Sequence, residues 1–475
     1  MRAIKTTVLY YTSGQLQSRV NCHFERMREI SLRAAAEISH SVRNDTSLSR
    51  DFAVAMIFHF GLKIFSTRQA HGVGNIEGFD YNEVRMMYLD HSATTPVDAR
   101  VLDAMLPYWT ENFGNPSSLH RFGQRALAAV DEARQTVADI LGAHTREIIF
   151  TANGTEANNL ALRGVALAAR GAMGDHNAGD HKGRPNIITT PIEHHAILRT
   201  CEQLEREFDF EITYVPVNRH GIVNPDDVAR AMTERTVLIS VMYANNEVGT
   251  IEPLAEIGKL ARARGVAFHT DAVQAGGYLN VNVNDLNVDL MSLGSHKFHG
   301  PKGVGVLYGR SGIKILPTQT GGNQERGRRA GTENVPYLVG FAKALALAQS
   351  ERAETNARLR AQRDRLVEHV LETIPGAELT GHPTERLPGH SSFVIPGAIG
   401  DEMVFALDLA GVAVSTGSAC TAGSPEPSHV LAALGYAPDI ARGALRITLG
   451  RENTDREMQQ AMRVIPETIE KIRRQ

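Results

Sequence analysis

Cysteine is scarce in this chain of 475 residues, which has only Cys22, Cys201 and Cys420. Three widely spaced thiols exclude a disulfide framework and match no zinc-binding spacing, so we expect a reducing compartment. An excess of charge is also missing, because 50 basic side chains face 53 acidic ones and the net charge is −3. This balance provides no basic footprint for nucleic acid, and we expect no direct nucleic-acid binding.

Long hydrophobic runs are absent as well. The longest, "FAVAMIFHFGLKIF" at 52–65, is too short to cross a membrane and is interrupted by His59 and Lys63. The first residues lack a secretory pattern, so we expect a cytoplasmic protein without a membrane segment. The length exceeds what one hydrophobic core usually supports, so two or more domains are expected.

From Met87 onward, apolar runs rich in Val and Ile alternate with amphipathic stretches. Near-continuous apolar strands separated by helices predict an α/β fold with a mainly parallel sheet covered on both faces. The expected strands lie at 146–150, 186–191, 210–217, 236–244, 266–272 and 288–294, and the clearest helices at 155–171 and 254–265.

The C-terminal part predicts a second, smaller α/β domain. A long helix over 334–374 leads into strands in "HSSFVIPG" and "ALRITLG" and helices in "DEMVFALDLAG" and the last twenty residues.

Cys420 stands in "VSTGSACTAGS", among small and polar residues that predict an exposed, mobile segment. A buried cysteine normally packs among larger apolar side chains, and none is present here. The thiol is therefore either placed for reactivity or is an ordinary surface cysteine, and this loop alone does not decide between them.

Lys297 follows an apolar strand in "SLGSHKFHGPKGVG". Ligands of open α/β sheets bind beyond the carboxyl ends of the strands. A lysine there can bind a phosphate, form a Schiff base or remain a solvated surface residue, which is the commonest case.

Polar side chains at three other strand ends favour a cofactor site. Asp271 and Gln274 in "HTDAVQ" could hold a pyridinium nitrogen. Gly154 and Thr155 in "FTANGTEANN" start a helix, where they either bind a phosphate or simply cap it. His194 in "TTPIEHHAIL" would by itself be a structural histidine. Together with the lysine, these residues predict a site for pyridoxal phosphate.

Nine motifs occur in order along residues 87–475: "GNPSS", "GTEANN", "EHHA", "NNEVGT", "DAVQ", "SHKFHGPKG", "ERGRRAGTEN", "GSACTAGSPEPSHVL" and "LRITLGR". This series resembles that of the NifS/IscS-type cysteine desulfurases of the class V pyridoxal-phosphate-dependent aminotransferases. The resemblance implies aminotransferase fold type I, with a large mainly parallel-sheet domain that binds pyridoxal phosphate and a smaller α/β C-terminal domain.

The resemblance also implies domain boundaries. Residues 1–86 would be an extension outside the family and poorly ordered, and 87–104 would pack with the small domain. The large cofactor-binding domain would cover 105–345, and the small domain with the cysteine loop 346–475.

The resemblance assigns roles around pyridoxal 5′-phosphate. Lys297 would bind the aldehyde covalently, and Asp271 would pair with the pyridine nitrogen. His194 would stack on the ring and assist proton transfers. The other implied roles are ring-oxygen contacts by Gln274 and Asn246, phosphate contacts by Gly154, Thr155, Ser295 and His296 with Thr332 of a neighbouring subunit, and substrate-carboxylate binding by Arg446 with Asn246.

Cys420 would be the catalytic nucleophile in this scheme. L-cysteine would become L-alanine, and the Cys420 persulfide would pass to an iron–sulfur scaffold or to tRNA-thiolation carriers. The resemblance implies a homodimer and no intrinsic metal, with Cys420 as a transient ligand of a cluster shared with the scaffold. Two rival hypotheses are a selenocysteine lyase or related lyase or aminotransferase on this fold, and a catalytically silent sulfur-relay or docking protein.

Residues 1–86 lie outside the resemblance, and Met86 and Met87 offer natural starts for a chain of family length. We expect this segment to be dispensable. The rival interpretation is an organelle-targeting peptide, because 1–50 is serine-rich and basic. Its four acidic residues against eight basic ones weaken that alternative.

Overall fold

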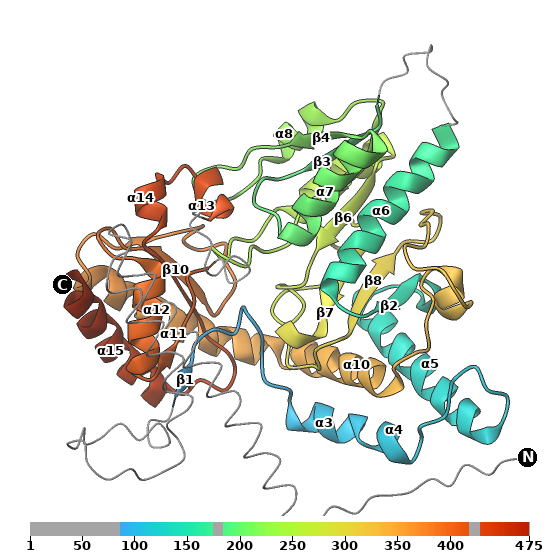
Figure 1. The fold of residues 1–475 in the computed structure, drawn as a ribbon, viewed down its shortest axis with the longest axis horizontal. Helices are drawn as coiled ribbons and strands as arrows, with labels where there is room; N and C mark the ends of the chain where they lie inside the picture. Colours follow the sequence, from blue (N-terminus) through green and yellow to red (C-terminus); the bar gives the residue numbers. More distant parts are fainter. Residues whose placement is uncertain (1–85, 174–183, 418–427, 475) are drawn as a thin grey trace, which may run out of the picture. The chain divides into compact units, whose positions relative to one another are not determined.

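A seven-stranded sheet forms the centre of the fold in the computed structural model, which describes residues 86–173, 184–417 and 428–474 (Figure 1). The strand order is β2-β8-β7-β6-β5-β3-β4, and only β8 runs antiparallel to its neighbours. This confirms the predicted mainly parallel sheet. The strands are β2 (Ile148–Thr151), β3 (Asn186–Thr189), β4 (Glu211–Tyr214), β5 (Thr236–Ser240), β6 (Ala267–Asp271), β7 (Leu290–Gly294) and β8 (Gly305–Gly309).

Helices cover both faces of this sheet. α6 and α7 pack on one face, while α5, α9 and α10 enclose the larger core on the other (Figure 1). Buried side chains on both faces explain why most of the strands are apolar along their whole length. The helices are α3 (Ala99–Met105), α4 (Pro107–Thr110), α5 (Arg121–Leu141), α6 (Gly154–Met173), α7 (His195–Phe208), α8 (Pro225–Ala231), α9 (Leu254–Arg264) and α10 (Val335–Ser350), with short 3₁₀ turns η1 (Thr145–Glu147), η2 (Ser295–Lys297) and η3 (Gln324–Gly327).

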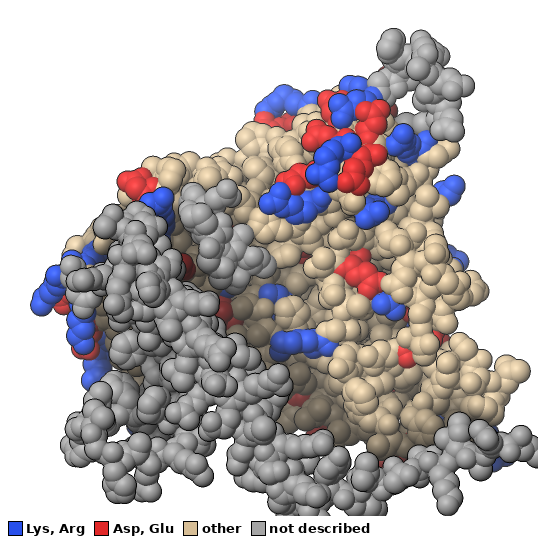
Figure 2. Space-filling model, in the orientation of Figure 1, with Lys and Arg blue, Asp and Glu red and all other residues tan. Residues whose placement is uncertain are grey.

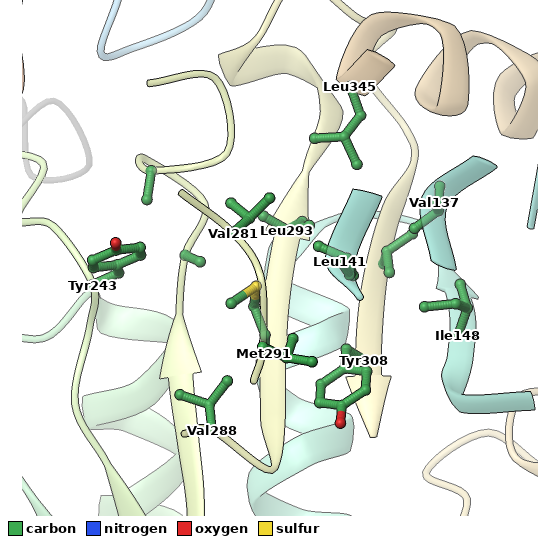
Figure 3. Close-up of a cluster of buried hydrophobic side chains, with 14 of the residues drawn as sticks. Val137, Leu141, Ile148, Tyr243, Val281, Val288, Met291, Leu293, Tyr308 and Leu345 are labelled. Atoms are coloured by element: carbon green, nitrogen blue, oxygen red, sulfur yellow. The ribbon is translucent and has the colours of Figure 1, made fainter. Parts of the chain in front are cut away.

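The larger core lies between the sheet and α5. Met291 of β7 and Tyr308 of β8 lie in one cluster with Val137 and Leu141 of α5 (Figure 3). Local signals fix the helix ends, because the His120 ring accepts the Gly123 N–H at the start and Gly142 ends α5 with φ 67°. Helices often end in a residue with this left-handed backbone conformation, and that residue is usually glycine.

A three-stranded antiparallel sheet, β12-β10-β9, carries a separate core against α11, α12 and α15. The strands and helices predicted near the C-terminus are confirmed. A parallel pair, β1-β11, joins the first described strand to this region. The elements are β1 (Met87–Tyr88), α11 (Arg352–Thr373), β9 (Glu378–Leu379), β10 (His390–Val394), α12 (Gly400–Leu409), β11 (Val412–Ala413), α13 (His429–Ala433), α14 (Pro438–Ala441), β12 (Ala444–Thr448) and α15 (Asp455–Arg473).

The prediction of a single helix over 334–374 is wrong. The chain breaks between α10 and α11 at Glu351, where ψ is 0°. The Glu351 carboxylate accepts a hydrogen bond from Arg100 at 2.5 Å and lies 3.7 Å from Arg451. Both partners are distant from Glu351 in the sequence, so the contacts at the break are tertiary ion pairs. No Gly or Pro at this position would have indicated the break in the sequence.

Within the described ranges, no helix has both the length and the apolar character needed to cross a membrane. Lys and Arg side chains are mixed with Asp and Glu over the region of α7, so this part of the face does not carry charge of one sign (Figure 2).

A buried ion pair fixes the loop that carries Thr332. Arg134 of α5 binds both carboxylate oxygens of Glu325 at 2.6 and 2.8 Å, and the two side chains are 7% and 3% exposed. Glu325 and Arg326 have φ of 47° and 58°, which side chains other than glycine rarely adopt. The ion pair therefore holds a strained turn in place.

Replacing Arg134 with methionine should leave the Glu325 carboxylate buried and unpaired. We expect a loss of about 3–5 kcal/mol in the free energy of unfolding, measured by chemical denaturation. The matched control is Arg365→Met, which breaks the exposed Arg365–Asp455 pair and should cost less than about 1 kcal/mol. Equal losses in the two variants would contradict this account.

Candidate active site

Most of the candidate residues follow parallel strands, and the carboxyl ends of parallel strands meet at one edge of the sheet. β2 leads to Gly154 and Thr155, β6 ends at Asp271, and β7 leads into the turn with Lys297. His194 follows β3 and Asn246 follows β5. The topology therefore brings these six residues to the same edge.

The start of α6 lies against this edge at close range. A Cβ on Gly154 would lie 2.5 Å from a methyl group of Val273, and a Cβ on Gly294 would lie 3.6 Å from the Gly154 nitrogen. Glycine at position 154 therefore lets the start of α6 approach the segment after β6, whereas the separation at Gly294 is an ordinary van der Waals contact. The first N–H groups of a helix have no intrahelical acceptor, so they can bind an anion such as a phosphate.

Asp271 is buried and held in a fixed orientation. One carboxylate oxygen accepts a hydrogen bond from Asn158 Nδ2 at 2.6 Å, and the other accepts one from the Val273 N–H at 3.0 Å. A carboxylate fixed in this way can pair with a protonated ring nitrogen. Sequence reasoning did not identify Asn158, because nothing in the motif "GTEANN" shows which side chain turns toward β6.

Lys297 contacts the first described segment of the chain. Its Nζ donates to the Ser92 carbonyl and, at 2.8 Å, to the Ala93 carbonyl. Gln274 Nε2 also donates to the Ser92 carbonyl, at 2.9 Å. Residues 92–93 are therefore part of the site, although sequence reasoning assigned them no role.

The turn before Lys297 is largely buried. The Ser295 hydroxyl is buried and has no hydrogen-bond partner among the described residues. His296 Nδ1 lies 3.2 Å from the Thr94 hydroxyl, and burial lowers the pKa of His296 to about 4. The imidazole is therefore neutral at pH 7.

His194 caps α7. Its Nδ1 accepts the Ala196 N–H at 3.0 Å, so the neutral ring carries its proton on Nε2. Position and tautomer are thus set by the helix start, and the ring can serve as a hydrogen-bond donor through Nε2.

Glu193, directly before His194, is fully buried. Its Oε1 accepts hydrogen bonds from the Met242 N–H and the Thr190 hydroxyl, both at 2.9 Å. Burial is the main cause that raises its pKa to about 8. The side chain is therefore mostly protonated at pH 7, and sequence reasoning gave it no role.

The raised pKa predicts how stability varies with pH. Between about 4.5 and about 8 the native state binds more protons at Glu193 than the unfolded state, so its contribution to stability falls as pH rises. Replacing Glu193 with glutamine should remove this contribution. The difference in melting temperature, Glu193→Gln minus wild type, should therefore increase as the pH is raised from about 5 to about 9. The exposed Glu205→Gln is the control, and a constant difference for Glu193→Gln would contradict the prediction.

Arg446 also lies at this site, and it comes from β12 of the three-stranded sheet. It is 2% exposed, and its Nη1 donates to both the Asn246 and the Gly417 carbonyl, each at 2.9 Å. It also forms a 2.8 Å ion pair with Asp90. A buried, planar guanidinium of this kind is suited to binding a carboxylate.

Cys420 and Cys22 lie outside the described residues, whereas Cys201 is described. Cys201 is fully buried in α7 among apolar side chains, and burial raises the pKa of its thiol. A buried, protonated thiol is unreactive. The described chain on both sides of residues 418–427 is held near the site, because Gly417 bonds to Arg446 and the Ser428 hydroxyl donates to Glu247 at 2.5 Å.

The fold and this edge of the sheet define a class: a pyridoxal-phosphate enzyme of aminotransferase fold type I. The residues fit this cofactor, because an oriented carboxylate, a lysine amine and the open start of α6 all follow strands that end at one edge of the sheet. Residues 87–461 match the model of the family described as aminotransferase class-V, and the chain belongs to this family.

Similar proteins of known name agree with this assignment. The chain is 48% identical over 402 residues to cysteine desulfurase IscS of Methanosarcina thermophila, covering 84% of this chain and 96% of that one. It is 47% identical over 389 residues to cysteine desulfurase IscS of Dictyoglomus turgidum, covering 82% and 96%. A solved NifS-like protein superposes with a TM-score of 0.74 at 37% identity, covering 81% of this chain and 99% of that one.

Proposed function

We propose that this class-V enzyme is a cysteine desulfurase that uses Lys297, His194 and Cys420 for catalysis. It would convert L-cysteine into L-alanine and leave the sulfur on Cys420 as a persulfide. One observation carries the proposal: residues 90–93 contact both the Lys297 amine and the Arg446 guanidinium. The Lys297 amine and the carboxylate-binding Arg446 thus both contact the same four residues. An amino-acid substrate needs two such groups within reach of its α-carbon and its carboxylate. A solved relative, 34% identical with a TM-score of 0.66, is described as in complex with cysteine.

Pyridoxal phosphate, when bound, provides an electron sink for the substrate. Asp271 would hold its ring nitrogen, with Gln274 and Asn246 beside the ring oxygen. The start of α6 at Gly154 and Thr155, with Ser295 and His296, would hold the phosphate.

The chain's own groups perform the remaining tasks. Lys297 would remove the substrate's α-proton, and His194 would stack on the ring and donate through Nε2. Arg446 would bind the substrate carboxylate together with Asn246. The Cys420 thiolate would attack the substrate sulfur, forming an S–S bond while the C–S bond breaks, and a proton returned to carbon would complete alanine.

The position of Cys420 in the sequence suits this role. Cys420 lies three positions after Gly417 in the sequence. Gly417 itself bonds to Arg446. The persulfide would then pass to an iron–sulfur scaffold or another sulfur acceptor, with Cys420 as a transient ligand of a shared cluster.

We also propose a homodimer in the cytoplasm. Six large apolar side chains are exposed between residues 102 and 122, on α3, α4, the start of α5 and the segments that join them. Monomeric proteins rarely expose a large contiguous apolar patch. Thr332 is exposed as well, which suits contact with a phosphate bound by a second copy. Sedimentation should give twice the mass of one chain. The exposed side chains are Leu102, Leu106, Trp109, Phe113, Leu119 and Phe122.

The direct test supplies the purified protein with pyridoxal phosphate, then adds L-cysteine and a reductant. We expect visible absorbance, and alanine and sulfide in equal amounts. A protein that stays colourless, or that makes no alanine, would contradict the proposal. A Cys420→Ala variant that releases sulfur from cysteine at the full rate would favour a lyase, such as one acting on selenocysteine.

A further inference from the structure

Arg446 is held by one carboxylate and two carbonyls. Its Nη2 donates to Asp90 Oδ1 at 2.8 Å, while its Nη1 donates to the Asn246 and Gly417 carbonyls. Its Nε–H is buried and has no acceptor among the described residues. A buried donor without a partner is costly, so the site is arranged to receive one more acceptor.

Asp90 reaches Arg446 because its backbone runs beside β12. It forms a parallel bridge with Thr448, and the Ser92 N–H donates to the Thr448 hydroxyl at 2.9 Å. Side chains two residues apart on a strand share a face, so Arg446 lies on the same face as Thr448. The backbone alignment therefore sets which residue of the first segment faces the guanidinium.

The Asp90 carboxylate supplies a negative charge to Arg446, which the Asn246 and Gly417 carbonyls do not. A guanidinium that is 2% exposed needs a counter-charge, and among the described residues Asp90 is the one carboxylate in an ion pair with it. Charge-assisted hydrogen bonds are also stronger and more directional than neutral ones. Asp90 thus fixes the plane of the guanidinium before a substrate arrives.

We propose that Asp90 is a positioning residue for substrate binding, which orients Arg446 so that its remaining donors meet the α-carboxylate of the amino acid. The inference rests on the proposed function, because the substrate is taken to be an amino acid whose carboxylate binds Arg446. Asp90 acts through Arg446 and takes no part in breaking the C–S bond.

The test compares Asp90→Ala with Asp90→Asn, which keeps an acceptor oxygen but no charge. Asp90→Ala should raise the KM for L-cysteine about tenfold and change kcat by less than about twofold, because ground-state and transition-state binding are lost equally. Asp90→Asn keeps a hydrogen bond to Arg446 but not the charge, so its KM should lie between those of the wild type and Asp90→Ala. The Kd for L-alanine, from the absorbance of the loaded protein, should follow the KM in each variant.

A double-mutant cycle with Arg446→Ala shows whether Asp90 acts through Arg446. Asp90→Ala should have no further effect on L-alanine affinity when Arg446 is absent. The matched control is Glu378→Gln, which removes the carboxylate of the exposed Arg219–Glu378 pair and should leave all constants unchanged.

Three results would overturn the inference: wild-type KM and L-alanine affinity in Asp90→Ala, additive effects in the cycle, or a lower melting temperature with unchanged L-alanine affinity. A wild-type protein that makes no alanine from L-cysteine would instead contradict the proposed function. The L-alanine titration would still decide the role of Asp90 in that case.

Discussion

Lys297→Ala is expected to abolish both the visible absorbance of the protein and its activity on L-cysteine. The amine is the covalent attachment point proposed for the cofactor and also the base proposed for the α-proton. Losing a positioned base alone typically costs a factor of about 10²–10⁴, so we expect a fall in kcat of at least about 1,000-fold. Absorbance spectra and alanine assays on protein treated with pyridoxal phosphate measure the two effects.

Lys302→Ala is the control for this variant. Lys302 lies five positions further along the same Gly-rich segment, and it is exposed. Its loss should leave absorbance and kcat unchanged. A Lys297→Ala protein that keeps its colour and more than about one tenth of its activity would show that another group holds the cofactor.

Cys420→Ser is expected to reduce sulfur release from L-cysteine by at least about 1,000-fold, while the absorbance of the cofactor remains. A hydroxyl is a far weaker nucleophile than a thiolate near neutral pH, and loss of a catalytic nucleophile has effects of this size or larger. Because the residues proposed to hold the cofactor are intact, L-alanine should still bind with unchanged affinity.

Cys201→Ala separates a general thiol effect from a site-specific one. Cys201 is on the buried face of α7, and burial raises the pKa of its thiol, so we expect it to have no catalytic role. Its replacement should lower stability by about 1 kcal/mol and leave kcat unchanged. Equal activities for Cys420→Ser and the wild type would exclude Cys420 as the nucleophile.

Sequence patterns predicted the parts of this molecule that depend on strand order. Apolar runs located β3, β5, β6 and β7, and the rule that parallel strands share a carboxyl edge then placed His194, Asp271 and Lys297 at one end of the sheet. This rule does not depend on how far apart two strands are in the sequence. It therefore also groups residues that are distant along the chain.

Other features depend on contacts that no local pattern encodes. Asp90 pairs with Arg446 across 356 positions, and only the alignment of the first segment with β12 brings them together. The helix break at Glu351 likewise coincides with ion pairs to Arg100 and Arg451. The position of a buried carboxylate such as Glu193 also follows from the assembled core rather than from its neighbours in sequence.

The central claim is that a strand-end amine and the thiol of residue 420 act on one amino-acid substrate. Mass spectrometry of the protein after brief incubation with L-cysteine, without reductant, tests it most directly. The account predicts one added sulfur atom on the peptide that contains Cys420 and an equal amount of alanine. Alanine formed without added sulfur, or sulfur found on Cys201 or Cys22 instead, would contradict it.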